Sequence, residues 1–220
     1  AGFRVCFAND FEEVCVRTYR YNHPEIPVDK VVKDDIRKIA NNVQDYIDED
    51  VDVVVGGPPC QGFSSANQQR IIDDPRNELY KYYIECVKKI LPKFVVMENV
   101  RGMLKVADQV VEDYESIEEK RNGFTYSYTV SYKILNSLDF SVAQSRERLI
   151  YIAIRNDVAE KKDITPKAIF EEICGENEDK PHYLLRDALE YIKPLDAPRI
   201  KNTNEKDDER TGKKIDVNYY

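Results

Sequence analysis

The segment Val51–Val55 constrains the fold of this chain more than any other, because four of its five residues are valines. A strand rich in β-branched residues on both sides is typical of a parallel sheet that is covered on both faces. The run ends in Gly56 and Gly57, which allow a sharp turn, and two prolines and Cys60 follow. The segment therefore predicts a buried strand whose carboxyl end presents a cysteine.

Strand-like and helix-like segments alternate along residues 1–155. Strands are predicted at the apolar runs 3–9, 51–55, 92–100 and 148–154. Helical spacing of apolar residues predicts helices at residues 11–22 and 77–91. Residues 128–135 predict a more polar, antiparallel strand. This order predicts an α/β fold with a Rossmann-like, doubly wound and mostly parallel sheet, in which ligands bind beyond the carboxyl ends of the strands.

The same spacing predicts which side chains are buried. In the helix over residues 77–91, with Asn77 as its N-cap, the predicted face is Tyr80, Tyr83, Ile84, Val87 and Leu91. In the helix over residues 11–22, the predicted face is Val14, Thr18 and Tyr21. Three cysteines that fall on strand or helix patterns are predicted to be core residues: Cys6, Cys15 and Cys86.

Composition limits the classes of partner. A hydrophobic fraction of 42%, without any run near the roughly 18 apolar residues of a membrane span, predicts a globular protein with no membrane partner. Five cysteines without regular spacing predict no disulfide framework and favour a reducing, cytoplasmic location. The two histidines, His23 and His182, are too few to predict a metal site. A net charge of −8 argues against a nucleic-acid partner, but the acidic residues are clustered in runs, which leaves room for a locally basic surface.

Four short motifs occur in a fixed order along the first part of the chain. They are "GGPPCQGFS" at residues 56–64, "DPRNELY" at 74–80, "ENV" at 98–100 and "QSRER" at 144–148. Together they resemble the motif set of the cytosine-C5 DNA methyltransferases. The resemblance covers roughly residues 1–155, and it implies the catalytic domain of a class I methyltransferase that acts on double-stranded DNA.

The resemblance implies that Cys60 is the catalytic nucleophile. Cytosine does not accept a methyl group at C5 directly, but a thiolate that adds to C6 converts the ring to an enamine whose C5 is nucleophilic. The addition pushes negative charge toward N3 and O2 of the ring, and the resemblance places Glu98 there as a proton donor. The alternatives are a buried structural cysteine at position 60 and a surface or capping glutamate at position 98.

Two arginines complete the implied catalytic set. Arg146 and Arg148 are two residues apart and are expected on the same face of a strand. A guanidinium there can steady the base at O2 or hold Glu98, and Arg146 is the better candidate for contact with the base. Arg148 is equally compatible with a structural ion pair. Gln144 follows "SVA" where the family usually has "GvP", so the shape of this loop is not predicted.

The resemblance also implies residues on the substrate side, namely Pro59, Gln61, Ser64 and Asn99. A cytosine inside a duplex is out of reach of a thiol, so the mechanism requires the base to be flipped out of the stack. Residues 61–76 are expected to close over the flipped base, with Ser64 and Arg70 near phosphates. A solvent loop without contacts is the alternative. Asn99 is expected to orient the turn.

The implied methyl donor is S-adenosylmethionine. The residues that the resemblance assigns to its binding are Asp10, Phe11, Asp35, Ile36, Pro58 and Leu79. At the end of the first strand, Asp10 is placed to accept hydrogen bonds from ribose hydroxyls, and Phe11 to stack on the adenine. A competing interpretation makes Asp10 the N-cap of the following helix.

The resemblance divides the chain into two parts. Residues 1–155 are expected to be the methyltransferase catalytic domain, and residues 156–220 the start of a truncated target-recognition region. The glycine-rich loop that precedes the first strand in the family is missing from the sequence, as are the late motifs. We therefore expect this chain alone to bind cofactor weakly and not to select a DNA sequence. The implied setting is a bacterial restriction–modification system with a cognate restriction endonuclease, or an orphan enzyme.

Three other functions remain open. A tRNA-methylating relative shares the motifs but carries a "CFT" element that is absent here. A non-catalytic, methyltransferase-like scaffold is disfavoured by the complete set of Cys60, Glu98, Arg146 and Arg148. A cysteine hydrolase would pair Cys60 with one of the two histidines, neither of which lies in a recognisable pattern.

Overall fold

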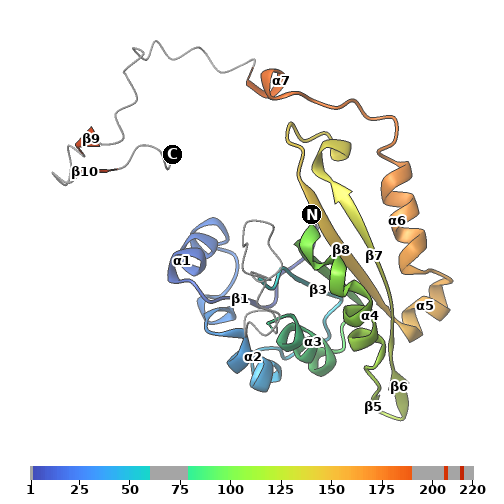
Figure 1. The fold of residues 1–220 in the computed structure, drawn as a ribbon. Coiled ribbons are helices and arrows are strands. Elements are labelled where there is room, and N and C mark those ends of the chain that lie inside the picture. Colours follow the sequence, from blue (N-terminus) through green and yellow to red (C-terminus); the bar gives the residue numbers. More distant parts are fainter. Residues whose placement is uncertain (1, 60–78, 190–205, 208–213, 216–220) are drawn as a thin grey trace. The chain divides into compact units, whose positions relative to one another are not determined.

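The structure is a computed structural model that describes residues 2–59, 79–189, 206–207 and 214–215 (Figure 1). The chain divides into two units, one ending at Tyr183 and the other beginning at Leu184. The second unit contains helix α7 (Leu185–Leu189) and the antiparallel strands β9 (Lys206–Asp207) and β10 (Lys214–Ile215). The other elements described below all belong to the first unit.

The first unit is built on a four-stranded mixed sheet with the strand order β3-β4-β8-β7. Strands β3 (Val53–Gly56) and β4 (Phe94–Val100) run parallel, as the valine-rich run predicts. Strand β8 (Glu147–Arg155) runs antiparallel both to β4 and to β7 (Tyr128–Asn136). The antiparallel orientation predicted for residues 128–135 is therefore confirmed, and β8 adds a second antiparallel pair beside β4.

A two-stranded parallel sheet pairs β1 (Ala8–Asp10) with β2 (Val31–Lys33). Helix α1 (Glu13–Asn22) connects these strands, and helix α2 (Ile36–Asn42) follows β2. The first strand is shorter and begins later than the predicted run over residues 3–9, because residues 2–7 have no regular structure. Further along the chain, β5 (Glu119–Arg121) and β6 (Phe124–Tyr126) form a hairpin ahead of β7.

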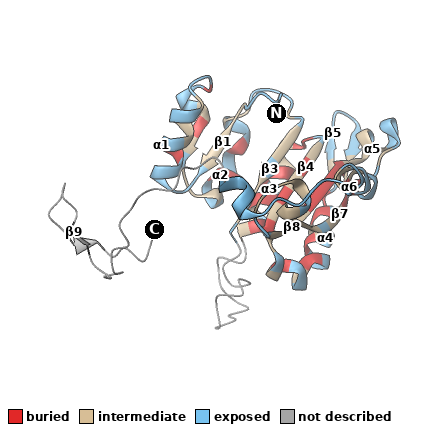
Figure 2. Ribbon diagram, turned by 90° about the horizontal axis from the view of Figure 1, so that it is seen from above, coloured by how far each residue is buried: buried red, intermediate tan, exposed pale blue. Residues whose placement is uncertain are grey.

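Helices cover both faces of the four-stranded sheet. On one face lie α3 (Leu79–Ile90) and α4 (Ala107–Glu115), and on the other α5 (Asn156–Lys162) and α6 (Pro166–Gly175). Side chains of β8 alternate between the two sides, with Leu149, Tyr151 and Ala153 toward α3 and α4 and with Ile150, Ile152 and Ile154 toward α5 and α6. This double coverage explains the uninterrupted apolar run of β8 and confirms the α/β class (Figure 2). The predicted boundary at residue 155 falls between β8 and α5, but α5 and α6 pack on the sheet and the first unit extends to Tyr183.

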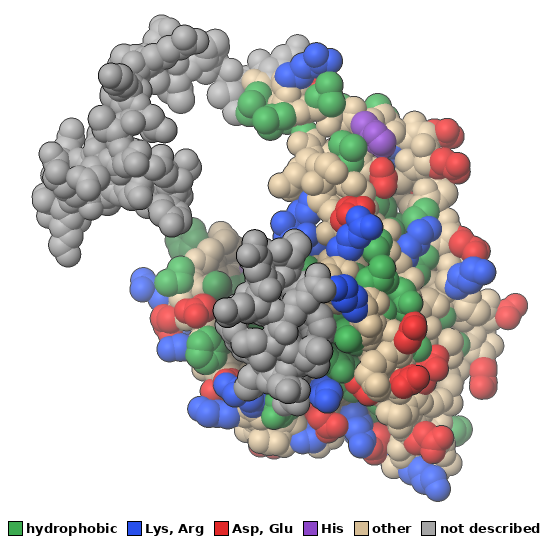
Figure 3. All heavy atoms as spheres, viewed as in Figure 1, with side chains coloured by type: hydrophobic (Ala, Val, Ile, Leu, Met, Phe, Trp, Pro, Cys, Tyr) green, Lys and Arg blue, Asp and Glu red, His purple; other side chains and the backbone are tan. Residues whose placement is uncertain are grey.

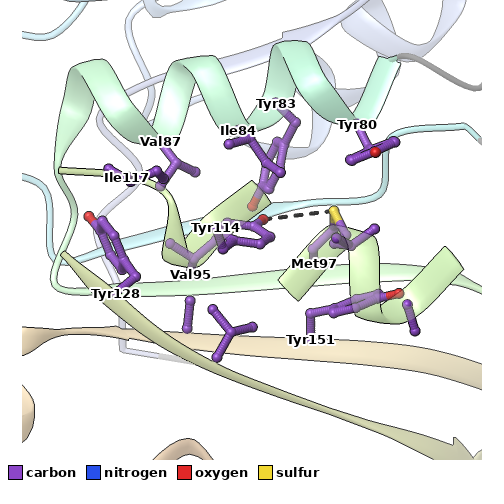
Figure 4. Close-up of a cluster of buried hydrophobic side chains, with 14 of the residues drawn as sticks. Tyr80, Tyr83, Ile84, Val87, Val95, Met97, Tyr114, Ile117, Tyr128 and Tyr151 are labelled. Atoms are coloured by element: carbon purple, nitrogen blue, oxygen red, sulfur yellow. Dashed lines mark hydrogen bonds between the residues drawn. The ribbon is translucent and has the colours of Figure 1, made fainter. Parts of the chain in front are cut away.

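The main core lies between α3, α4 and the sheet (Figure 4). Val87, Met97, Val110, Tyr114 and Leu149 are completely buried within it. The Tyr114 hydroxyl donates to Met97 Sδ at 3.8 Å, and burial raises the pKa of that hydroxyl well above its usual value. Burial of each large apolar side chain contributes roughly 1.5–3 kcal/mol. This cluster therefore holds β4 firmly against α3 and α4.

One of the two predicted helix faces is confirmed. All five residues predicted for α3 are buried, whereas Asn77 lies outside the described residues. The prediction for α1 is wrong, because Val14 and Tyr21 are 72% and 85% exposed. Instead, Val16 packs against Ile26 and Val31. The apolar residues of α1 lie on two sides of the helix, and only the side that faces β2 is covered.

The cysteines that were predicted to be core residues differ in their environments. Cys86 is buried, and burial raises the pKa of its thiol to about 11. Cys6 is half-buried, and Cys15 is exposed because it lies on the uncovered side of α1. Among the helices of the described ranges, none is long and apolar enough to cross a membrane.

Candidate active site

The turn that leads to Cys60 lies beside the carboxyl end of β4. Gly56 pairs with Met97 in the parallel register, so the residues after Gly56 continue alongside Glu98. A Cβ atom on Gly57 would lie 3.1 Å from Glu98 Oε2. The absence of a side chain at Gly57 therefore lets the carboxylate of Glu98 lie against the turn.

Asn99 holds the same turn in place. The residue is 4% exposed, and its Nδ2 donates to the carbonyl oxygen of Pro58 at 2.9 Å. Its Oδ1 accepts from the amide of Val100 at 2.9 Å. Because a buried polar group is costly to leave unpaired, these bonds fix the Pro58 carbonyl two residues before Cys60. This contact is the one expected of a residue that orients the turn.

The carboxylate of Glu98 forms an ion pair with Arg148. Arg148 Nε lies 2.6 Å from Glu98 Oε1, and the two side chains are 23% and 45% exposed, respectively. The antiparallel register makes this contact, since Arg148 lies opposite Val100 near the end of β4. Arg148 Nη1 also donates to the carbonyl of Glu147 at 2.8 Å. Of the roles left open for Arg148, an ion pair with the predicted catalytic glutamate is the one observed.

Arg146 lies just ahead of β8, which begins at Glu147. The expectation that Arg146 and Arg148 share one face of a strand is therefore wrong. Arg146 is exposed. The direction of its side chain is therefore set by the conformation of the loop before β8 and does not follow from strand alternation.

Tyr83 of α3 links the helix to both parallel strands. Its hydroxyl is within donating distance of two carbonyl oxygens, that of Val96 at 3.1 Å and that of Val54 at 3.3 Å. A Cβ atom on Gly56 would lie only 2.4 Å from the Tyr83 ring. The close packing of α3 on β3 therefore requires glycine at position 56.

A cavity of about 730 Å³ opens beside this turn. It is lined by residues of β1, α2, β3 and α3 and of the loops that follow the strands. The structure brings to this cavity Pro59 and all six residues predicted for the cofactor, which are Asp10, Phe11, Asp35, Ile36, Pro58 and Leu79. Because Pro58 and Pro59 belong to its wall, the cavity reaches the segment that precedes Cys60.

The polar part of the cavity is mainly acidic. Its lining includes four carboxylates and one guanidinium, from Asp10, Glu12, Asp34, Asp35 and Arg37. Asp35 is the N-cap of α2, and its Oδ1 accepts from the amide of Arg37 at 2.9 Å. The hydrogen-bonded guanidinium of Arg37 holds the pKa of the Asp35 carboxyl below its usual value. The cavity thus offers acceptors for hydroxyl groups and a favourable environment for positive charge.

Asp10 is only partly used by the backbone around it. Its Oδ1 accepts from the amide of Glu12 at 2.8 Å, while the N-cap of α1 is Glu12 itself. The competing interpretation of Asp10 as the N-cap is therefore wrong in position, although one carboxylate oxygen does stabilise the turn before the helix. Beside it, Asn9 Nδ2 donates to the carbonyls of Val32 and Asp34 at 3.1 Å and 2.9 Å.

Some predicted residues lie outside the described ranges, namely Cys60, Gln61, Ser64 and Arg70. The two histidines have carboxylate neighbours elsewhere in the first unit. His23 Nδ1 lies 3.1 Å from Glu25 Oε1, and His182 Nε2 lies 3.3 Å from Asp139 Oδ1. Each imidazole therefore has a carboxylate partner that does not belong to the turn.

The sequence did not predict several contacts at the site. Arg101, which directly follows β4, pairs with Glu147 at 2.6 Å between Nη1 and Oε2. Tyr83 was predicted as a core residue, but its hydroxyl contacts were not. The position of Asn9 at the end of an apolar run was a usable signal, because polar residues at strand ends often bind neighbouring backbone. Glu147 gave no signal, since its partner comes from another strand.

Charged side chains of both signs are interspersed on the face shown in Figure 3. The acidic runs of the sequence therefore do not merge into one continuous acidic surface on this face. A net charge of −8 for the whole chain is thus compatible with basic groups near the site, of which Arg101 and Arg148 are two.

Comparisons with known proteins relate the whole chain to one family. Residues 1–217 match the family model described as C-5 cytosine-specific DNA methylase. Type II methyltransferase M.FnuDI of Fusobacterium nucleatum is 39% identical over 72% of this chain and 42% of its own length. Type II methyltransferase M.NgoPII of Neisseria gonorrhoeae is 34% identical over 90% of this chain and 53% of its own length. The chain thus spans about half the length of these two relatives.

Solved structures show the same fold. A protein encoded within an E. coli prophage, described as a DNA modification methyltransferase, superposes with a TM-score of 0.62 at 22% identity, over 94% of this chain and 53% of that one. DNMT2 of Spodoptera frugiperda superposes with a TM-score of 0.53 at 21% identity, over 72% of this chain and 44% of that one. These likenesses support the assignment of a class I methyltransferase fold.

Proposed function

Because the chain belongs to the C-5 cytosine-specific DNA methylase family, we propose that the protein transfers a methyl group to C5 of a cytosine in double-stranded DNA. The observation that carries the proposal is the position of Glu98. Its carboxylate is paired with Arg148 and lies against Gly57, three residues before Cys60. The carboxyl that we propose as the proton donor and the segment that leads to Cys60 thus lie close together, which supports the proposal.

In the proposed reaction, the Cys60 thiolate adds to C6 of a cytosine that has been flipped out of the duplex. Glu98, whose carboxylate is ion-paired with Arg148, first takes up a proton from water and then donates it at N3, where the addition places negative charge, while Arg148 holds the carboxyl in position. Arg146 contacts O2 of the same ring. After C5 has been methylated, the C5 proton passes to water and the thiolate leaves C6, which re-forms the C5–C6 double bond. Return of the N3 proton to Glu98 restores the aromatic ring and the free enzyme.

The residues that line the cavity fit S-adenosylmethionine, which would supply an electrophilic methyl group on a positively charged sulfur. Carboxylates such as Asp10 are suitable acceptors for ribose hydroxyls, and the acidic lining favours a cationic ligand. Phe11 is 63% exposed and lines the cavity, so its ring is accessible for stacking on a flat base. Ile36, Pro58 and Leu79 add apolar surface.

The proposal extends to the setting of the enzyme. Relatives such as M.FnuDI and M.NgoPII are named as Type II methyltransferases. We propose that this protein likewise belongs to a restriction–modification system with a cognate endonuclease. Pro59, Gln61 and Ser64 are proposed to act on the DNA side, Asn99 to orient the turn before them, and the residues after Arg155 to begin the target-recognition region.

The direct test is methyl transfer from labelled S-adenosylmethionine to either duplex DNA or tRNA. The expected product is 5-methylcytosine in DNA, detected by mass spectrometry of the hydrolysed nucleosides, with none in tRNA. Methylation of tRNA alone would assign the chain to the tRNA-methylating relatives. Binding of DNA without methylation of either substrate would favour the non-catalytic scaffold.

The contact between Gly57 and Glu98 gives a second test. In Gly57→Ala, the new methyl group would lie 3.1 Å from Glu98 Oε2 and displace the carboxylate by a few tenths of an ångström. We expect kcat to fall about tenfold, because misplacement of a catalytic group by a fraction of an ångström costs rate steeply. The matched control is Gly175→Ala, where nothing lies within 4 Å of the added atom. Equal kcat values in the two variants would contradict the proposed role of the contact.

A further inference from the structure

The side chain of Asn136 closes the loop that joins β7 to β8. Its Oδ1 accepts hydrogen bonds from the amide of Leu138 at 3.1 Å and from the amide of Arg146 at 3.0 Å. Its Nδ2 donates to Ser145 Oγ at 3.1 Å. One side-chain amide thus binds both the beginning and the end of the loop over residues 137–146.

Arg146 is held on both sides of its Cα atom. Its amide is bound by Asn136 Oδ1, and its carbonyl accepts from the amide of Ser137 at 3.0 Å. The following residue, Glu147, is paired with Asn136 in the β7–β8 register. Because Arg146 precedes the strand, its amide is bound by a side chain instead of a partner strand.

Bonds within the loop add to this closure. Ser137 Oγ donates to the carbonyl of Gln144 at 2.5 Å, and the amide of Val142 donates to the carbonyl of Ser137 at 3.2 Å. Ser141 has a φ of 61°, in the left-handed region that non-glycine residues seldom adopt. Such a conformation persists only where neighbouring contacts stabilise it, and the hydrogen bonds within the loop provide these contacts.

From these contacts we infer that Asn136 is a positioning residue for Arg146. The inference rests on the proposed function, in which the Arg146 guanidinium contacts O2 of the flipped cytosine. Arg146 is exposed and its side chain is long, so the direction of its Cα–Cβ bond decides which region the guanidinium reaches. Fixing the two peptide groups that flank Cα fixes that direction. Asn136 acts through Arg146 and has no need to touch the DNA.

The chemistry of the amide provides a conservative variant. Asparagine supplies the acceptor for two backbone amides and a donor for Ser145. In Asn136→Asp, a carboxylate oxygen keeps both acceptor bonds, and the Ser145 hydroxyl can donate in the reverse direction. In Asn136→Ala, all three bonds are lost. Aspartate is therefore expected to rescue what alanine removes.

The first measurement compares steady-state kinetics of DNA methylation. Asn136→Ala is expected to lower kcat about 10- to 100-fold, as misplacing one catalytic group does. The KM for S-adenosylmethionine is expected to stay within about threefold, because Asn136 is not part of the cavity lining. Asn136→Asp is expected to retain kcat within about threefold of the unaltered protein. Equal losses in Asn136→Asp and Asn136→Ala would overturn the inference.

A double-mutant cycle shows whether Asn136 acts through Arg146. The combined variant Asn136→Ala/Arg146→Ala is expected to be no slower than Arg146→Ala alone. Once the guanidinium is absent, the hydrogen bonds of Asn136 have no catalytic group left to position. Multiplied, independent losses would overturn the inference. Full activity of Arg146→Ala would overturn it too, together with the role proposed for Arg146.

Hydrogen exchange at the Arg146 amide provides a readout that does not depend on catalysis. We expect Asn136→Ala to lose protection of this amide and Asn136→Asp to keep it. The matched control is Ser145→Ala, which removes one bond of the three and is expected to retain both protection and kcat. Unchanged protection in Asn136→Ala would overturn the inference. If Asn136→Ala lost protection of the Arg146 amide but the unaltered protein did not methylate DNA, the positioning of Arg146 by Asn136 would be supported and the proposed function contradicted.

Discussion

Replacement of Cys60 by serine is expected to abolish methyl transfer, with a loss of about 10⁴-fold or more in the single-turnover rate. The proposed reaction begins with nucleophilic addition to C6 of cytosine, and a serine hydroxyl is a far weaker nucleophile than a thiolate. Serine is close to cysteine in size, so the turn held by Asn99 and Gly57 remains compatible with it. The measurement is transfer of a labelled methyl group to duplex DNA with enzyme in excess.

A covalent trap makes this prediction independent of turnover. When the target base is 5-fluorocytosine, C5 has no proton to lose, so the thiol cannot leave C6 after methylation and the adduct accumulates. We expect a stable protein–DNA adduct with the unaltered protein and none with Cys60→Ser. The control is Cys15→Ser, which changes an exposed thiol of α1 and should leave the adduct intact. An adduct that persists in Cys60→Ser would assign the chemistry to another residue.

Replacement of Glu98 by glutamine is expected to lower kcat by about 10²- to 10⁴-fold, the usual contribution of a positioned general acid. Glutamine has the same shape and retains an oxygen that can accept from Arg148 Nε, but it cannot transfer a proton to N3. The loss should therefore appear in kcat, with a much smaller change in the affinity for DNA. Rapid-quench measurement of the chemical step and a separate binding titration distinguish the two effects.

A neighbouring carboxylate provides the control for Glu98→Gln. Glu147 forms an ion pair with Arg101 at 2.6 Å, the same distance as that between Glu98 and Arg148, and the two glutamate side chains are similarly exposed, at 41% and 45%. Glu147→Gln should change kcat by less than about threefold, because exposed ion pairs contribute about 0–1 kcal/mol. If both variants lost activity equally, the effect would come from the net charge of the region and proton transfer by Glu98 would be excluded.

Local patterns predicted those parts of the molecule that packing within one element determines. The buried face of α3 follows from helical spacing because a single broad surface, the sheet, covers it. The predicted buried face of α1 was wrong because this helix has apolar residues on two sides, and the short strands β1 and β2 cover only one of them. The apolar run of β8 did not predict that this strand is antiparallel to β4, since parallel and antiparallel strands that are buried on both faces have the same composition.

The candidate site was predictable wherever a motif carries the chemistry. All six residues assigned to the cofactor line one cavity, and Glu98 lies at the turn that leads to Cys60. The supporting contacts were not predictable, because their partners are distant in sequence. Asn136 binds the amide of Arg146 across a loop, and Arg101 meets Glu147 across two strands. No sequence pattern around any of these four residues predicts its partner.

The antiparallel docking of β8 on β4 determines when the site is assembled as the chain folds. Parallel pairing of β3 and β4 around α3 can form without the later part of the chain, but the partner of Glu98 comes from position 148. Arg148 reaches Glu98 only when β8 has docked on β4, because β8 carries it. The carboxyl of Glu98 is thus expected to gain its guanidinium in the step in which β8 docks on β4. Because Leu149, Tyr151 and Ala153 of β8 belong to the central core, this ion pair and that core are expected to be lost together when β8 detaches.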